Sequence, residues 1–398
     1  MASRTVLISE AGIAGCTLAY WMARNGWSVT VMERGASLRT SGSPVDVRGP
    51  AAHVAERMNI ASQLRDARIR LDGMTLLDSA GRRVARVDIG TLRSLLAPHD
   101  VEIARGDLAL ILHAASANHA EYVFGDSIMA LIQDDNGVEV TFERSRARQF
   151  DLVVGADGMH SIVRRLMYGA DAEFVVHAGL YAATVALPRG CDAGREMFLL
   201  RTPGRAVALH PCQGNPLAYF VYWHPELPGF DYRNIDQHKR LLESAFAGLG
   251  WRVPEFVAAA RAASDMYFDQ VARVHVPDWS RGRIALLGDA ASCVSLFGDG
   301  STLAMAGAYQ LAAALAEYPA DPQPRLPTLP GYPRQARLLE AEIHGVCGLP
   351  HRAQVADRAL GQHAYVLAGH GRARRGRAPG PAAPREIQLI SVATRRIK

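Results

Sequence analysis

Short apolar runs alternate with helix-like patterns near the start of the chain. Thr5–Ser9 and Val29–Met32 are continuous apolar segments, which is typical of strands buried on both faces of a parallel sheet. Between them, residues 16–25 carry apolar side chains at helical spacing and end at Gly26, a residue favoured just after helices. A strand, tight turn, helix and strand within about 30 residues predict a βαβ unit.

The pattern changes between residues 174 and 223, where short strands alternate with Pro and Gly. This spacing predicts an antiparallel or mixed sheet inserted between two halves of the first domain, so the expected fold class is α/β with a Rossmann-like domain. The expected domains are 1–172 with 265–320, the insert 173–264, and a Pro-, Arg- and Ala-rich region 321–398 that is atypical and partly disordered. Further helices are predicted over 50–66, 107–118 and 301–317, and a hairpin around 79–81.

Charge and cysteine content exclude several classes of protein. The net charge of +5 comes from the end of the chain, where residues 369–398 hold eight basic residues and one acidic residue. The rest is near neutral, so no nucleic-acid surface is expected. The five cysteines form no C-x-x-C pair, so neither a disulfide framework nor a metal site is expected, and the expected location is the cytoplasm. No apolar run is long enough for a membrane span, so no membrane partner is expected.

Small residues crowd the turn after the first predicted strand. In a dinucleotide-binding βαβ unit, glycines there tighten the turn, let the backbone approach a diphosphate and let the helix pack on the strand. An acidic residue ending the second strand then accepts hydrogen bonds from a ribose. The first glycine position is held by Glu10, and the alternative is that the small residues serve packing alone. The cofactor-binding candidates here are Gly12, Ala14, Gly15, Glu33 and Arg34.

Two later buried strands also end in glycine and aspartate. Gly155-Ala156-Asp157-Gly158 follows one, and Gly288-Asp289 follows the other, with Gly298-Asp299-Gly300 before a predicted helix. Open α/β sheets bind ligands at such carboxyl ends, and a helix N-terminus can face a flavin carbonyl. The alternatives are a turn that caps the next helix, and small residues needed only for packing. Asp157, Gly158, Asp289, Gly298 and Gly300 are the candidates here.

The three motifs, in this order, resemble the class A FAD-dependent monooxygenases, the para-hydroxybenzoate hydroxylase-like family, and its tetracycline- and polyketide-modifying branch. The resemblance covers about residues 4–318 and includes Val45–Pro50 and Ile103–Leu108. It implies that Arg105 contacts the flavin, that Asp289 binds its ribityl chain, and that Asp157-Gly158 takes part in cofactor and NADPH binding. It also places Asp46 and Arg48 near the flavin ring, as candidates for the otherwise unknown catalytic residues.

By this resemblance the chain would be a flavoprotein oxidoreductase with FAD as cofactor and NADPH or NADH as co-substrate. It would hydroxylate an aromatic or polyketide-like small molecule with molecular oxygen through a flavin C4a-hydroperoxide, as a monomer or weak dimer. Aromatic residues of the predicted insert, Tyr219 and Tyr222 among them, either form its core or line a substrate pocket.

Three departures from the family pattern favour an alternative function. Glu10 brings negative charge and bulk to the turn that should hold a diphosphate, which is expected to weaken FAD binding. Asp299 adds negative charge near the expected flavin, and the resemblance fades after about Pro319. The alternative is a non-redox member of the fold, a cyclase or binding scaffold, or a degenerate copy with impaired FAD binding.

Overall fold

The computed structural model describes residues 3–91, 100–191, 194–294 and 299–316. The first part of the fold is a six-stranded sheet in the order β17-β18-β11-β1-β2-β7, parallel throughout except where β17 pairs with β18. Its strands are β1 (Thr5–Ser9), β2 (Ser28–Glu33), β7 (Glu121–Phe124), β11 (Leu152–Gly155), β17 (Ser280–Arg281) and β18 (Ile284–Leu286). The apolar run of β1 is buried on both faces, as its composition predicts.

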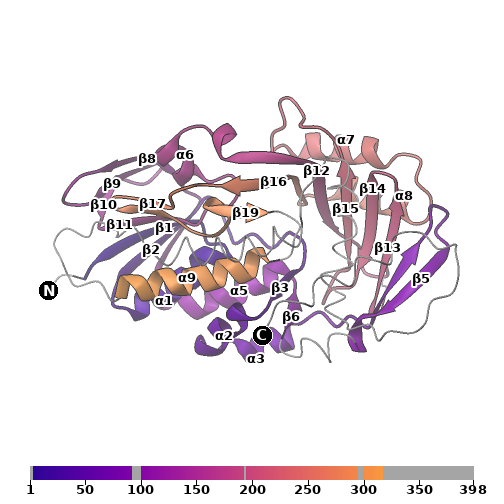
Figure 1. Cartoon of the computed structure of the whole chain (residues 1–398), viewed down its shortest axis with the longest axis horizontal. Helices are drawn as coiled ribbons and strands as arrows, with labels where there is room; N and C mark the ends of the chain where they lie inside the picture. Colours follow the sequence, from indigo (N-terminus) through magenta and orange to yellow (C-terminus); the bar gives the residue numbers. More distant parts are fainter. Residues whose placement is uncertain (1–2, 92–99, 192–193, 295–298, 317–398) are drawn as a thin grey trace, which may run out of the picture.

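Helices cover one side of this sheet. Figure 1 shows α1 (Ile13–Arg24), α5 (Arg105–Ser116) and α9 (Gly300–Ala316) side by side below β1 and β2. Above the sheet in that view lie α6 (Ile162–Tyr168) and a three-stranded sheet of β8 (Ile128–Gln133), β9 (Val138–Phe142) and β10 (Arg148–Phe150). The predicted βαβ unit is present, because β1 and β2 pair in parallel on either side of α1.

The second part is an eight-stranded mixed sheet in the order β19-β16-β12-β15-β14-β13-β4-β5. All neighbours are antiparallel except β13 and β4, which are parallel. The strands are β4 (Gly73–Leu77), β5 (Arg83–Asp88), β12 (Val175–Ala186), β13 (Glu196–Thr202), β14 (Arg205–His210), β15 (Leu217–Trp223), β16 (Tyr267–His275) and β19 (Ser292–Val294). The predicted α/β fold class with a mixed-sheet insert is confirmed.

The eight-stranded sheet draws strands from both sides of segment 173–264, which supplies β12 to β15. The hairpin β4–β5 comes from earlier in the chain, and β16 and β19 come from later. Spacing along the sequence indicates that a hairpin exists but not which distant strand it pairs with. The domain boundaries given above therefore stay a prediction, and region 321–398 lies outside the described residues.

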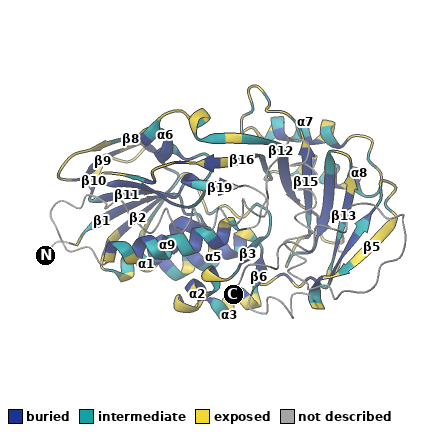
Figure 2. Cartoon of the chain, in the orientation of Figure 1, coloured by how far each residue is buried: buried dark blue, intermediate teal, exposed yellow. Residues whose placement is uncertain are grey.

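Side chains alternate between the two faces of the large sheet. Tyr181, Phe220 and Tyr222 point to the face covered by α7 (Ile235–Phe246) and α8 (Val253–Ala262), where they form one core. Figure 2 shows the central strands buried and β5 exposed at the sheet's edge. The opposite face carries Tyr219, Ala182 and Val271, which pack in a separate cluster.

The prediction of a single helix over residues 50–66 is wrong. The structure has two helices there, α2 (Pro50–Arg57) and α3 (Ala61–Asp66), separated by Asn59 with a φ of 59°. A left-handed residue cannot continue an α-helix, and Asn tolerates that conformation better than most residues. The apolar spacing runs on through the break, which is why the sequence alone did not reveal it.

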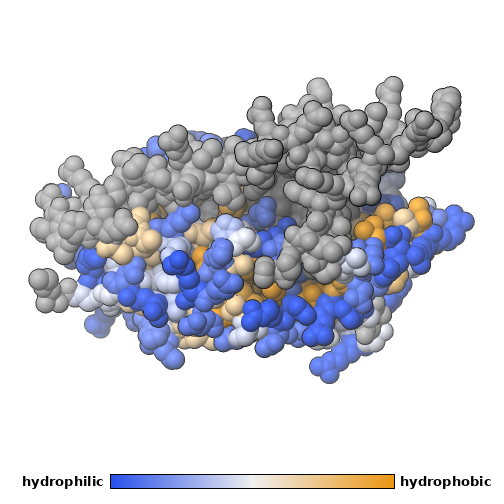
Figure 3. All heavy atoms as spheres, turned by 60° about the horizontal axis from the view of Figure 1, so that its bottom comes forward, coloured by the Kyte–Doolittle hydropathy of each residue, from blue (hydrophilic) through white to orange (hydrophobic). Residues whose placement is uncertain are grey.

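Figure 3 shows one face of the molecule in which the described residues are mostly polar. Smaller apolar areas lie between the hydrophilic side chains of that face. In the described ranges, none of the helices combines the length and apolar character needed to cross a membrane.

Candidate functional site

A cavity of about 640 Å³ lies where strand ends of the six-stranded sheet meet the large sheet. Its volume is in the range of small-molecule and cofactor sites. Nine of the predicted site residues line it: Gly12, Ala14, Glu33, Arg34, Arg105, Asp157, Gly158, Asp289 and Gly300. The motifs are far apart in sequence, and they converge because β1, β11 and β18 are parallel and end at the same edge.

The turn between β1 and α1 is tight, as its small residues predict. A Cβ on Gly15 would lie 2.0 Å from the carbonyl oxygen of Glu10, so that position admits glycine alone. Gly15 packs behind the turn and does not line the cavity. Gly12 precedes the first residue of α1, and a Cβ there would meet nothing closer than 3.9 Å. The N-terminus of α1 therefore opens on the cavity, with no acidic residue in its first turn.

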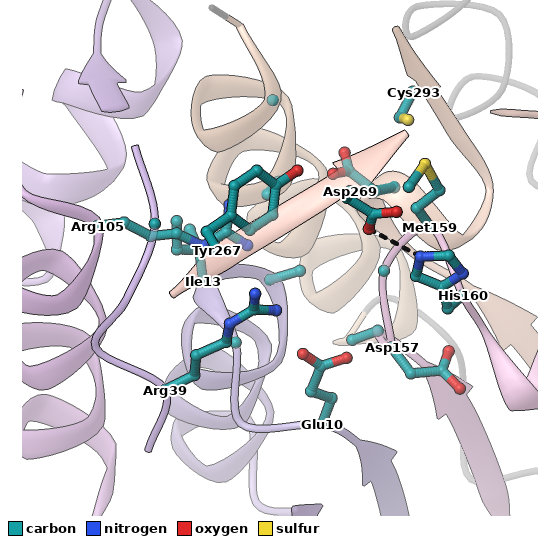
Figure 4. Close-up of a pocket in the computed structure, with 18 of the residues that line it drawn as sticks. Glu10, Ile13, Arg39, Arg105, Asp157, Met159, His160, Tyr267, Asp269 and Cys293 are labelled. Carbon is teal, nitrogen blue, oxygen red and sulfur yellow. Dashed lines mark hydrogen bonds and ion pairs between the residues drawn. The ribbon is translucent and has the colours of Figure 1, made fainter. Parts of the chain in front are cut away.

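Glu10 has a left-handed backbone with a φ of 79°, the conformation that favours glycine at this place. Figure 4 shows its carboxylate pointing into the cavity, with Arg39 on one side and Asp157 on the other. Its Oε1 and Oε2 lie 3.9 Å from where Cβ atoms of Gly12 and Gly158 would stand. Among the described residues, none donates a hydrogen bond to this carboxylate.

Burial and negative neighbours change the acidity of Glu10. Burial contributes most, and the carboxylates of Glu33 and Asp157 add to it, raising the Glu10 pKa to about 7. Arg105 and Arg39 act in the opposite direction. The Glu10 carboxyl group is therefore poised to change charge near neutral pH.

Glu33, at the end of β2, stabilises the turn between β1 and α1 by accepting a hydrogen bond from one of its backbone N–H groups. Its Oε2 accepts a hydrogen bond from the Ala11 N–H (3.0 Å), and its Oε1 accepts one from the Gly35 N–H (2.7 Å). The next residue, Arg34, donates to the Tyr232 hydroxyl (3.2 Å) at the cavity lining. Both residues line the cavity, and their part in binding a cofactor stays a prediction.

Asp157 lines the cavity and also caps α6. Its carboxylate accepts hydrogen bonds from the Ile162 N–H (2.8 Å), the Val163 N–H (3.1 Å) and the Ser161 hydroxyl. These contacts satisfy donors that a helix start leaves open. The capping alternative thus describes what the carboxylate does here, while Gly158, with a φ of 69°, turns the backbone past the cavity.

Arg164 joins the second motif to the third. Its side chain is fully buried and donates to the carbonyls of Ala290 (3.0 Å) and Met159 (2.6 Å) and to Asp171 Oδ1 (2.7 Å). A guanidinium can serve three acceptors at once because its donors form a planar fork. Arg164 follows the Gly155–Gly158 motif by six residues, and nothing in the sequence around it showed that it would be buried.

Asp289 lies against the first turn. Gly288 has a φ of 61°, and a Cβ there would stand 3.3 Å from Ala14 Cβ, so the third motif packs directly on α1. Burial raises the pKa of the Asp289 carboxyl group, and Arg105 acts against that shift. Gly300 begins α9 at the cavity, whereas Gly298 lies outside the described residues.

Arg105 begins α5 and reaches the cavity past Gly42. A Cβ on Gly42, whose φ is 137°, would stand 2.8 Å from Arg105 Cδ, so the loop after β2 needs glycine to pass this side chain. The same loop brings Arg39 into the lining. No pattern in the sequence pointed to Arg39, because it lies in an irregular segment.

Asp46 and Arg48 are paired with each other and do not belong to the cavity lining. The Asp46 carbonyl accepts from the Ser301 hydroxyl (2.6 Å), and the Arg48 N–H donates to Thr302 Oγ1 (3.3 Å). In this arrangement the two residues fasten strand β3 (Val45–Val47) to the start of α9.

The sequence analysis did not identify the pair of His160 and Asp269, which adds a polar group to the cavity lining. His160 Nε2 lies 2.8 Å from Asp269 Oδ2, and the His160 ring stacks on Tyr232 with centroids 3.7 Å apart. Asp269 is on β16, and its carboxylate could be assigned to the site only once the pairing of β16 with β12 was known. Of the aromatic residues considered, Tyr219 lines the cavity, and Tyr222 belongs to the core under α7 and α8.

A family model described as an FAD binding domain matches residues 3–322. An uncharacterized protein of Mycobacterium tuberculosis is 37% identical over 316 residues, 78% of this chain and 85% of the relative. A flavin-dependent monooxygenase of Legionella longbeachae is 34% identical over 78% of this chain and 80% of its own length. The FAD-dependent monooxygenase asL4 of Sarocladium schorii is 33% identical over 79% and 76%.

The chain is also similar in fold to proteins of solved structure. The tetracycline destructase Tet(51) superposes with a TM-score of 0.78 at 25% identity, covering 92% of this chain and 96% of that one. HpxO of Klebsiella pneumoniae, solved with FAD and uric acid, has a TM-score of 0.66 at 19% identity over 91% and 90%, a similarity of fold.

Proposed function

Because this chain belongs to the FAD-dependent monooxygenases of class A, we propose that it hydroxylates an aromatic or polyketide-like small molecule at the expense of NADPH or NADH. The predicted family, its tetracycline- and polyketide-modifying branch, the FAD cofactor and the flavoprotein oxidoreductase class are confirmed. A small-molecule substrate and molecular oxygen follow from the family. The nicotinamide and the substrate class belong to the proposal.

The geometry of the β1–α1 turn is the observation that best supports the proposal that this cavity binds FAD. The N-terminus of α1 presents backbone N–H groups to the cavity, and Gly12 leaves room for a large anion to approach them. The residues fit FAD as follows: Gly12 and Ala14 for the diphosphate, Glu33 and Arg34 for the adenosine, Asp289 for the ribityl chain and Arg105 for the ring. Glu10 is the one lining residue of this turn that opposes the fit.

Bound FAD would supply the redox and oxygen chemistry, which the family resemblance routes through a flavin C4a-hydroperoxide. The chain's own contribution is to orient the substrate and exclude water. Ala182, Tyr219 and Val271 give the cavity an apolar wall on the large sheet. Burial raises the pKa of Tyr219, so its hydroxyl stays neutral and can hydrogen-bond a substrate oxygen.

His160 and Asp269 add a polar group to the same cavity as that wall. Such a mixture of an apolar face and a few convergent polar groups suits an aromatic substrate with oxygen substituents. The expected cytoplasmic location and monomeric or weakly dimeric state remain predictions.

The proposal is tested by turnover with labelled oxygen. Protein reconstituted with FAD would be mixed with NADPH or NADH and a panel of phenols, polyketides and tetracyclines under ¹⁸O₂. We expect nicotinamide oxidation that a substrate accelerates, and one ¹⁸O atom in the product by mass spectrometry. Oxidation that no compound accelerates, with hydrogen peroxide as the sole product across a broad panel, would argue against it.

A second function follows from Glu10. Its carboxylate stands inside the cavity, which favours a non-redox cyclase or binding scaffold, or a degenerate copy that no longer holds FAD. The two functions differ in one direct observation. A wild-type protein that binds its small molecule yet takes up no FAD, together with a Glu10→Gly variant that does take up FAD, would support this second function.

A further inference from the structure

The feature that sets this site apart is an ionisable side chain inside the turn that faces the diphosphate. We propose that Glu10 couples dinucleotide binding to a proton: FAD enters together with one proton, taken from solvent by the Glu10 carboxylate. The resulting neutral carboxyl group donates a hydrogen bond to a diphosphate oxygen. This inference rests on the proposed FAD site and adds a condition on when that site can be filled.

The direction in which the Glu10 side chain leaves the main chain is fixed by its backbone. The Glu10 N–H donates to the Met32 carbonyl (2.7 Å), and the Glu10 carbonyl oxygen packs against Gly15. With both peptide groups held, the left-handed φ directs the side chain into the cavity rather than toward solvent. A different direction of the Glu10 Cα–Cβ bond would cost the turn its contacts to β2 and α1.

The carboxylate also lies on the path that a diphosphate would take. Its two oxygens stand near the backbones of Gly12 and Gly158, one on each side of the cavity. Those two glycines belong to the first and second motifs, which converge on the cofactor. A diphosphate bound at the N-terminus of α1 must therefore meet Glu10 directly.

The charges that face Glu10 come from four elements. Glu33 on β2 and Asp157 after β11 are negative, while Arg39 from the loop after β2 and Arg105 at the start of α5 are positive. Glu33 and Asp157 each accept backbone N–H donors. Within the described residues, Glu10 accepts none, so its negative charge has the least support of the three.

An ionised Glu10 would repel the diphosphate, whereas a neutral one removes the repulsion and gains a donor. The pKa of about 7 in the free protein, set by burial and then by Glu33 and Asp157, means that the proton is already bound in mildly acidic solution. The diphosphate raises that pKa further. Affinity for FAD is therefore highest below about pH 7 and falls as the pH rises above it, by up to about tenfold per pH unit for one linked proton.

The test is a titration of the full chain with FAD between pH 5.5 and 9, followed by isothermal calorimetry in two buffers of different ionisation enthalpy. For the wild type we expect Kd to rise by up to about tenfold per pH unit above pH 7, with uptake approaching one proton per FAD at pH 8. Glu10→Gln keeps the shape and a donor but cannot ionise, so its Kd should change little with pH and its proton uptake should vanish. Glu56→Gln, at an exposed glutamate on α2, serves as the matched control and should behave as the wild type does.

Smaller ligands show which part of FAD is responsible for the pH dependence of binding. ADP-ribose carries a diesterified diphosphate like that of FAD, with no ionisation of its own in this pH range, and should show the same pH dependence as FAD, whereas adenosine should not. A Kd for FAD that is independent of pH in the wild type, or a pH dependence unchanged in Glu10→Gln, would overturn the proposal while leaving the FAD site intact. Should Glu10→Gln fail to fold, Glu10→Gly, which restores the residue that this backbone conformation favours, takes its place. If none of these proteins binds FAD at any pH, the proposed function fails as well.

Discussion

The turn after β1 and the turn after β11 both bring a carboxylate to the same cavity, but the two carboxylates are held differently. Asp157 accepts hydrogen bonds from two backbone N–H groups and a hydroxyl at the start of α6. Glu10 sits in a strained left-handed conformation, and no donor from the described residues reaches its side chain. The Asp157 carboxylate is therefore held by hydrogen bonds of the fold, whereas the Glu10 carboxylate can contact any ligand that enters the cavity.

The difference teaches how to interpret an acidic residue in a binding motif. A carboxylate whose acceptors are used by the backbone mainly stabilises a turn, and its charge is already compensated. A carboxylate without donors stays free to respond to protons and ligands. The following substitutions break or sharpen the comparison, beginning with the largest expected effect.

Replacing Arg164 by Leu should disrupt the supports of the β11 turn most strongly. The change removes a fully buried guanidinium together with its hydrogen bonds to the Ala290 and Met159 carbonyls. We expect the free energy of unfolding to fall by about 4 kcal/mol, measured by urea denaturation. Arg165→Leu is the control, since that side chain is partly exposed, and it should lose about 1 kcal/mol or less. Equal losses in the two variants would contradict the role given to Arg164.

Replacing Gly15 by Ala should disrupt the β1 turn. The new methyl group would meet the Glu10 carbonyl oxygen at 2.0 Å, and a backbone atom cannot move aside as a flexible side chain could. We expect a loss of about 3 kcal/mol in thermal or urea unfolding. Gly12→Ala adds the same methyl group where there is space and should change the stability by less than about 1 kcal/mol. If Gly15→Ala were as stable as the wild type, the turn would be less tightly packed than the structure shows.

Replacing Glu10 by Gln should change how the stability of the FAD-free protein depends on pH. Burial, then Glu33 and Asp157, raise the pKa of Glu10 from 4.5 to about 7 in the folded state. The folded chain therefore holds this proton more tightly than the unfolded chain does. The associated stability is fully present below about pH 4.5 and is lost as the pH rises through about 7.

We expect Glu10→Gln to be more stable than the wild type at pH 8 by about 2 kcal/mol, because partial access of solvent to the cavity reduces the full effect of the shift. At pH 4.5 the two proteins should be equally stable. Thermal unfolding at a series of pH values measures the difference. A constant difference across the series would contradict the assignment of the titration to Glu10.

Replacing Asp157 by Ala removes the cap of α6 and should have the smallest effect on stability. A lost N-terminal cap costs about 1 kcal/mol, and Ser161 still accepts from the Arg164 N–H. Asp157→Asn, which keeps an acceptor, should recover most of that loss in the same urea unfolding experiment. Loss of several kcal/mol in both variants would show that the charge itself, rather than the cap, holds the turn.

Local patterns predicted the first half of the fold well. The buried runs of β1 and β2, the small residues between them and the Gly-Asp endings of β11 and β18 follow from short stretches of sequence. The parallel arrangement then brings these endings together with no further information. Of the nine predicted site residues that line the cavity, seven lie at or just after the ends of these parallel strands, whereas Arg105 and Gly300 begin helices.

Other parts of the site depend on contacts between distant segments. Asp269 reaches the cavity through the pairing of β16 with β12, and Arg39 through an irregular loop that needs Gly42 to pass Arg105. Asp46 and Arg48 pair with each other beside α9, and their placement near the flavin, which came from the resemblance, stays a prediction. Side-chain pairing of this kind is decided by packing in three dimensions, and spacing along the chain does not encode it.

The central claim is that this cavity binds FAD through the β1–α1 turn. Its most direct test is the visible absorption of the purified chain after incubation with FAD at pH 6 and removal of free FAD by gel filtration. We predict that the flavin spectrum stays with the protein at about one FAD per chain and that Gly12→Glu, which adds a second carboxylate at the open face of the turn, abolishes it. A colourless wild type, together with a colourless Glu10→Gly variant, would contradict the claim.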